Sequence, residues 1–188
     1  MMLSELLSAT DEVSATSSRL AKINALARLL AAAPSDELRP LIGLLLAAPR
    51  QGRLGVGWRT LAGLDLAHAE AATLTITEVD HALDALAATS GAGSTAARQS
   101  VLHELAARCT AAEWDLLSRA MMGELRTGAL GGVLLDAIAR ASERPAASVR
   151  RAAMLSGDLG ETAVIALTGD ESDLEAVGLT VGRPVMPM

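Results

Sequence analysis

One stretch decides how the chain folds: residues 123–136 read GELRTGALGGVLLD. The pattern is typical of the end of one helix, a glycine-rich turn that carries Arg126, and the start of a second, apolar helix. At such a turn, backbone N–H groups without side-chain bulk around them can bind a phosphate oxygen, and the guanidinium of Arg126 can bind another. The alternative is a helix–helix turn that needs glycine only for its backbone angles. The turn taken alone favours this alternative.

Apolar residues recur at helical spacing along almost the whole chain, so we predict an all-α, multi-helix fold. Helices are expected over residues 3–14, 17–32, 36–47, 78–89, 94–109, 111–125, 130–141, 145–155 and 158–167, with a short one from Trp58. Thr77 is expected to cap one helix, and the capping-box pattern from Thr110 to Glu113 is expected to begin another.

Two irregular stretches, 64–76 and 90–94, are the expected division between two helical halves. After the last of these helices, the acidic residues 168–176 and the tail 177–188 are expected to form an exit linker with some extended character.

The composition restricts both the core and the kinds of nucleic acid that could bind. The chain has 188 residues, of which 51% are hydrophobic, with two Trp and no Phe or Tyr. Its core must therefore consist of Leu, Ala, Val and Met, which suits packed helices. Proteins that bind single strands or RNA stack bases on several aromatic side chains, which this chain lacks. Any nucleic acid bound here is expected to be a duplex held by its phosphates.

The net charge of −6 at first argues against DNA binding, but the acidic residues are unevenly distributed. From Asp158 onward the chain has six acidic residues and one basic residue, Arg183, which leaves residues 1–157 close to neutral. Phosphate binding requires a local basic face rather than a basic total. We therefore expect weak, salt-sensitive binding.

Other classes of site have little support in the sequence. Cys109 is the only cysteine, which excludes a disulfide framework and fits a reduced, cytoplasmic setting; we expect it to pack in a helix rather than act as a nucleophile. The carboxylates of a predicted helix are expected to form a solvated face, and the three histidines lack metal-ligand spacing; these residues are Glu78, Asp80, Asp84, His68, His81 and His103. No catalytic residue, metal site, signal peptide or membrane span is predicted.

Six segments, in order along the chain, resemble the N-terminal DNA-binding domain of ATP-dependent DNA ligases, most closely those of the actinobacterial type. Besides the turn at Arg126, they are ATSSRLAKI at 15–23, QGRLGVGW at 51–58, SGAGS at 90–94, RAAMLSGDL at 151–159 and VGRPVMPM at 181–188. The resemblance implies a monomeric helical clamp over residues 1–176 that grips nicked double-stranded DNA for nick sealing in replication, repair and recombination.

One departure concerns catalysis. In the family, the proline–methionine segment leads into a nucleotidyltransferase domain whose lysine, in a Lys-x-Asp-Gly motif, accepts AMP. Here residues 177–188 would be the linker to that domain, and the only lysine, Lys22, is followed by Ile23-Asn24-Ala25. We therefore expect an excised domain that cannot ligate alone and binds no cofactor. ATP and Mg²⁺ are implied for the parent enzyme, whose catalytic domains would be partners in the same polypeptide.

The resemblance and the residues together give candidate DNA-binding positions. They are Gly91, Gly93, Ser94, Thr95, Arg98, Arg126, Thr127, Gly128 and Arg151. The Gly91–Thr95 loop opens a helix whose free N–H groups suit a phosphate, although an ordinary helix start is the alternative. Arg151 is preferred over Arg150, although charged pairs on helices are usually only solvated. Arg19 and Lys22 are a weaker pair, and Arg19 could instead bridge to Asp11 or Glu12.

A second function from another class remains open: a helical protein-interaction module without nucleic-acid binding. The acidic balance fits this alternative more naturally.

Overall fold

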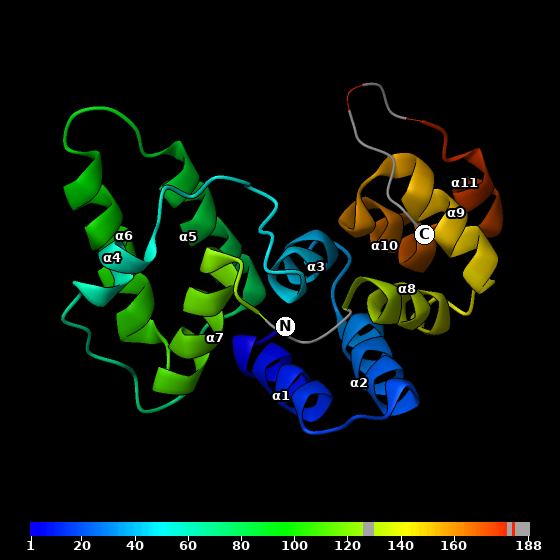
Figure 1. The fold of residues 1–188 in the computed structure, drawn as a ribbon, viewed down its shortest axis with the longest axis horizontal. Helices are drawn as coiled ribbons and strands as arrows, with labels where there is room; N and C mark the ends of the chain where they lie inside the picture. The colour runs from blue at the N-terminus through cyan, green and yellow to red at the C-terminus, as the bar shows by residue number, and fades with distance from the viewer. Residues whose placement is uncertain (126–129, 180–181, 183–188) are drawn as a thin grey trace. The chain divides into compact units, whose positions relative to one another are not determined.

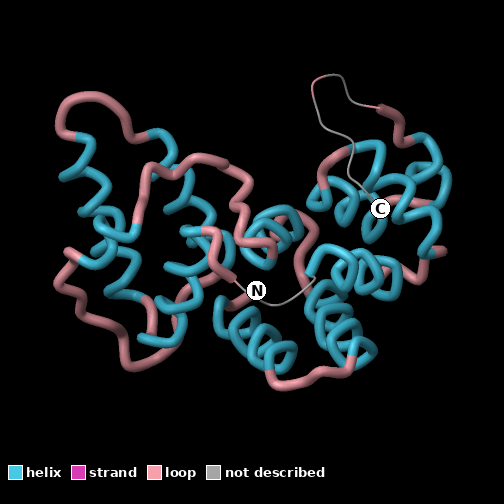
Figure 2. The backbone as a smooth tube through the Cα atoms, viewed as in Figure 1, coloured by secondary structure: helices cyan, strands magenta, loops and turns pink. Residues whose placement is uncertain are grey.

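The computed structural model describes residues 1–125, 130–179 and 182, and Figure 1 shows its helices. The described residues form helices joined by loops, which confirms the predicted all-α fold (Figure 2). The helices are α1 (Leu3–Ser14), α2 (Arg19–Ala32), α3 (Leu38–Leu45), α4 (Trp58–Ala62), α5 (Ile76–Ala88), α6 (Ser94–Arg108), α7 (Ala111–Met122), α8 (Leu130–Ala141), α9 (Ala146–Ser156), α10 (Leu159–Thr168) and α11 (Glu171–Ala176). Within the described ranges, no helix has the length and apolar character needed to cross a bilayer.

The chain divides into two compact units. Unit 1 comprises residues 1–8 and 43–126, and unit 2 comprises residues 9–42 and 127–188. The expected division at 64–76 and 90–94 is therefore wrong, because both stretches are loops inside unit 1. Irregular composition identifies a loop, whereas a unit boundary depends on which helices pack together, and periodicity does not reveal that.

The core of unit 1 is made of aliphatic side chains from α5, α6 and α7. Helix α5 packs against α6, and the buried residues include Val79, Leu83, Leu86, Leu102, Leu105, Leu116 and Leu117. The first residues of the chain are fixed to the segment before α5. The Leu3 N–H donates to the Leu74 carbonyl at 2.8 Å, and the Ile76 N–H donates to the Met1 carbonyl at 3.0 Å.

In unit 2, α8 is the central helix. It packs along α2 and also contacts α9 and α10, while α11 contacts α9 and α10 (Figure 1). Small and aliphatic side chains fill the interior, which allows the helices to approach closely; the buried ones include Leu26, Leu30, Leu134, Ala137, Ile138, Val149, Ala152 and Ala163.

Capping boxes begin three of the described helices, and for one of them the predicted cap residue was different. The box predicted from Thr110 to Glu113 is confirmed at the start of α7. The cap of α5 is Thr75 rather than Thr77, so that prediction is wrong. Glu78 decides the position, because it lies three residues after Thr75 and its carboxylate accepts the Thr75 N–H at 2.9 Å.

The third box begins α11, which the sequence analysis expected to be linker. Asp170 accepts the Asp173 N–H at 3.1 Å, and Asp173 accepts the Asp170 N–H at 2.8 Å. The helix buries Leu174 completely. The expectation of extended character over 168–176 is wrong, because two reciprocal caps and one buried leucine stabilise a short acidic helix.

The α5 cap makes stability sensitive to acid. Hydrogen bonds from Arg108 and then from Thr75 lower the pKa of Glu78 from 4.5 to about 2. Because the folded-state pKa is depressed, this stabilisation is present above pH 4.5 and is lost as pH falls toward 2.

The difference in urea midpoint between the wild type and Glu78→Gln should therefore be largest near neutral pH and shrink between pH 4.5 and 2. Arg108→Ala, which removes the main cause, should weaken this pH dependence; a difference constant with pH would contradict the assignment.

Candidate nucleic-acid interface

The Gly91–Ser94 loop presents open backbone at the start of α6. Gly91 and Gly93 have φ values of 79° and 81°, so the turn requires glycine at both positions. A Cβ atom at either one would meet nothing within 4 Å, so the space in front of the loop is open. Gly93 provides no side-chain cap for the fifteen-residue helix, and Thr95 is exposed while Ser94 is half-buried. The arrangement leaves backbone donors of a helix N-terminus facing outward.

Arg98, one turn further on, has a structural role. Its Nη2 atom donates to the Thr89 carbonyl, just beyond the end of α5, at 2.5 Å. A Cβ atom at Gly55 would lie 2.7 Å from Arg98 Nε, so the loop around Gly55 packs directly on this guanidinium. The half-buried Arg98 therefore joins two loops of unit 1, and its contact with DNA stays a prediction.

The turn that carries Arg126, Thr127 and Gly128 lies outside the described residues. The helix predicted after it is confirmed, with α8 running over Leu130–Ala141. Contacts of these three residues with DNA stay predictions.

Arg151 is exposed on α9, but its guanidinium has partners within unit 2. Nη1 donates to the Glu175 carbonyl at 3.1 Å and to the Val177 carbonyl at 3.5 Å, which caps the end of α11. Together with Ser148 and Leu174 the side chain lines an open depression of about 430 Å³. The guanidinium of Arg151 therefore fixes the end of α11. A contact between Arg151 and a phosphate stays a prediction.

Arg19 and Arg150 share one carboxylate on α8. Arg19 donates to Asp136 at 2.8 Å and to the Gly132 carbonyl at 3.1 Å, and Arg150 binds the other oxygen of Asp136. Although burial raises the pKa of Asp136, these hydrogen bonds bring it below its ordinary value. The expected alternative of a bridge from Arg19 to Asp11 or Glu12 is therefore wrong, since the arginine joins α2 to α8.

The carboxylates expected to form a solvated face of α5 are ion-paired instead. Arg50 donates from Nε and Nη2 to Asp80 at 2.6–2.9 Å and also binds Asp84. The hydrogen bond to Asp80 is the main reason why the pKa of Arg50 is raised. Glu78 pairs with Arg108 at 2.6 Å. The prediction failed because Arg50 lies thirty residues before Asp80 in sequence, where spacing within a helix gives no signal.

One exposed aromatic side chain, Trp58, was not assigned to any site from the sequence. Its side chain is 66% exposed at the start of α4, and the guanidinium carbon of Arg59 lies 5.8 Å from the indole centroid. The segment around it had been recognised as a motif, but exposure of the ring is not visible in the sequence. The described candidate residues are divided between the units, with residues 91–98 and Trp58 in unit 1 and Arg151 in unit 2.

Comparison with known proteins relates the chain to DNA ligases. A family model described as DNA ligase N terminus matches residues 64–139. The whole chain aligns with proteins named "Probable DNA ligase", at 54% identity in Pseudarthrobacter chlorophenolicus, 45% in Rhodococcus opacus and 48% in Saccharopolyspora erythraea. The chain is therefore similar to these DNA ligases along its whole length, and residues 64–139 are similar to the DNA ligase N terminus family. It spans about 37% of the length of these curated relatives, and the resemblance drawn from the six motifs is confirmed.

No site is predicted at the lysine or at the histidines of this chain. Its one lysine, Lys22, is not followed by the residues of an adenylation motif. Over residues 1–125 and 130–179, no three His, Cys, Asp or Glu side chains lie together as metal ligands. His68 instead faces the Ala106 carbonyl at 3.2 Å and the ring of Trp114 at 6.3 Å.

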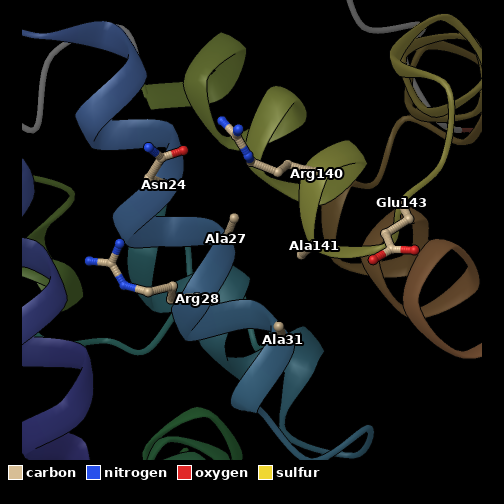
Figure 3. A pocket seen from close by; sticks show the side chains of 7 residues that line it. All are labelled: Asn24, Ala27, Arg28, Ala31, Arg140, Ala141 and Glu143. Carbon is tan, nitrogen blue, oxygen red and sulfur yellow. The ribbon is translucent and has the colours of Figure 1, made fainter.

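A groove in unit 2 lies between α2 and α8, with a volume of about 480 Å³ (Figure 3). Asn24 and Arg140 point into the groove from the two helices, and small side chains such as Ala27 and Ala141 form its sides. Arg28 is directed away from α8 and is held by Glu12 at 2.7 and 2.8 Å. Arg28 is neutralised by Glu12, and Glu143, which also lines the groove, balances the charge of Arg140, so the groove presents little net positive charge.

Proposed function

We propose that this chain grips nicked duplex DNA through its phosphate backbone, as the non-catalytic DNA-binding part of an ATP-dependent DNA ligase. The observation that carries the proposal is the alignment of the whole chain with proteins named probable DNA ligases. The open backbone at Gly91 and Gly93 supports it, because helix N-termini bind phosphate without reading bases. Recognition of the backbone suits nick sealing, which must work on any sequence.

The ATP-dependent chemistry is assigned to catalytic domains of the parent polypeptide rather than to this chain. Lys22 has no adenylation motif around it, and we assign ATP and Mg²⁺ to the parent enzyme alone. In this proposal the chain contributes only the positioning of DNA.

The second candidate, a protein-interaction module, is favoured by one observation, the net charge of −6. A titration with labelled nicked duplex separates the two functions. DNA binding should be saturable, and the logarithm of the association constant should fall linearly with the logarithm of salt concentration. An interaction module would show no saturable binding even at low salt.

Replacing Arg126 by alanine should weaken duplex binding to a similar extent for unrelated sequences. Loss of one phosphate contact should reduce the salt dependence by roughly one counterion. Fluorescence anisotropy at several salt concentrations measures both quantities. Thermal stability should change little, because the sequence predicts a turn at Arg126 and substitutions in surface turns usually have a small effect.

Arg28→Ala is the matched control, because it removes the same charge from a side chain already paired with Glu12. Its DNA affinity should equal that of the wild type. An Arg126→Ala protein with unchanged affinity and a melting temperature many degrees lower would show that Arg126 is structural.

A further inference from the structure

The loop over residues 51–58 is a family motif that the proposed function does not yet use. It ends in Trp58, whose side chain is 66% exposed, whereas the other tryptophan, Trp114, is 8% exposed. Water-exposed indole is unfavourable, because a tryptophan side chain has a large apolar surface. Among the described residues, the other exposed large apolar side chains are those of Leu20 and Leu179. Tryptophan is enriched at contact surfaces because its ring is apolar and its N–H is polar, so the exposed indole marks a candidate contact surface.

The loop that precedes the indole is anchored to unit 1. Leu54 is 4% exposed, and Gly55, with a φ of 67°, lies against the guanidinium of Arg98. Arg98 is itself fixed by the Thr89 carbonyl. Helix α4 buries none of its side chains, and a Cβ atom at Gly57 would meet nothing within 4 Å. The anchored loop therefore holds Trp58 outward at a defined position, without a neighbour to cover it.

The charge around the indole is positive in a chain that is acidic overall. No Asp or Glu occurs over residues 49–64, which contain Arg50, Arg53 and Arg59. Arg50 is neutralised by Asp80. Arg53 is exposed, with no hydrogen bond or ion pair among the described residues. Arg59 is also exposed, and its guanidinium lies over the Trp58 ring. This surface, made of Arg53, Trp58 and Arg59, is called the Trp58 patch and is complementary to an anionic partner.

We propose that the Trp58 patch is a second contact to the same DNA duplex, with the indole packed against deoxyribose in the minor groove. Apolar side chains are used in this way by minor-groove proteins, and the indole N–H can donate to the base acceptors there. Arg53 and Arg59 bind the phosphates on either side of the ring. The assignment rests on the proposed function and adds a desolvated apolar contact to a surface otherwise based on charge.

The contribution of the ring and that of the arginines differ in their dependence on salt. Trp58→Ala should weaken binding of nicked duplex about tenfold and leave the salt dependence unchanged, because no phosphate contact is lost. Arg53→Ala and Arg59→Ala should each reduce the salt dependence by roughly one counterion. Leu20→Ala is the control, since it removes another exposed apolar side chain, on α2; it should bind like the wild type.

Tryptophan fluorescence reports the contact directly. Nicked duplex should quench or shift the emission of the wild type with the same midpoint as the anisotropy titration. Trp58→Leu should abolish that change, because the buried Trp114 would be its only remaining indole. A wild type that binds no duplex would overturn the proposed function and this contact together. A wild type that binds duplex, with Trp58→Ala binding equally well and Trp58→Leu retaining the fluorescence change, would overturn the Trp58 contact alone.

Discussion

Replacing Leu134 by alanine is expected to lower the free energy of unfolding of unit 2 by about 2–5 kcal/mol. Leu134 is completely buried on α8, the helix that packs against α2, α9 and α10. Its removal leaves a cavity that three neighbouring helices cannot all close, so the lost transfer energy and the cavity both contribute. Urea unfolding followed by circular dichroism gives the size of the change, and hydrogen exchange of α8 and α9 amides assigns it to unit 2.

Leu20→Ala is the matched control for this change. It makes the same substitution on α2, at a side chain that is 59% exposed, so its effect should stay within about 0.5 kcal/mol. Equal effects of the two substitutions would mean that α8 is not the packed centre of unit 2.

Helix positions were largely predictable because their signals are local. Helix α8 has the predicted bounds, and so does α1, because apolar periodicity and the flanking residues define both ends. Helix α9 ends near the predicted position, where Gly157 has a φ of 65° and provides the left-handed C-cap. The two errors at helix starts, Thr77 in place of Thr75 and the missed α11, arose from capping boxes whose acidic residue was not weighed.

The partners of charged side chains could not be predicted, because they lie far away in sequence. Arg19 binds Asp136, 117 residues later, and Arg50 binds Asp80, thirty residues later. Such pairs depend on how the helices pack within a unit. The sequence therefore identified the charged residues correctly and assigned several of them the wrong surroundings.

The candidate site was predictable only where backbone conformation decides it. Gly91 and Gly93 have the positive φ values that an open turn requires. Two glycines directly before Ser94 indicate such a turn in the sequence. Arg98 and Arg151 were selected for their charge, yet both guanidinium groups bind backbone carbonyls near the ends of other helices. Exposure of Trp58 had no signal at all, since an indole in a glycine-rich motif is as compatible with a core as with a surface.

Cys109 provides the other large expected effect, within unit 1. Its side chain is completely buried at the end of α6, and its carbonyl accepts the Ala69 N–H at 2.8 Å. Burial, with a smaller contribution from Glu113, raises the pKa of the Cys109 thiol from 9.0 to about 12. The expected packing role is confirmed, because reactive cysteines are exposed and have a lowered pKa.

Labelling of Cys109 by a thiol reagent at pH 8 should be at least about a thousandfold slower in the folded protein than in urea. Only the thiolate reacts, and its fraction at pH 8 falls from about one in ten to about one in ten thousand when the pKa rises from 9.0 to about 12. Burial slows access further. Because the chain has one cysteine, the absorbance of the released label reports this site alone. Equal rates with and without urea would mean that the end of α6 is open, and that the loop held by the Cys109 carbonyl is not anchored there.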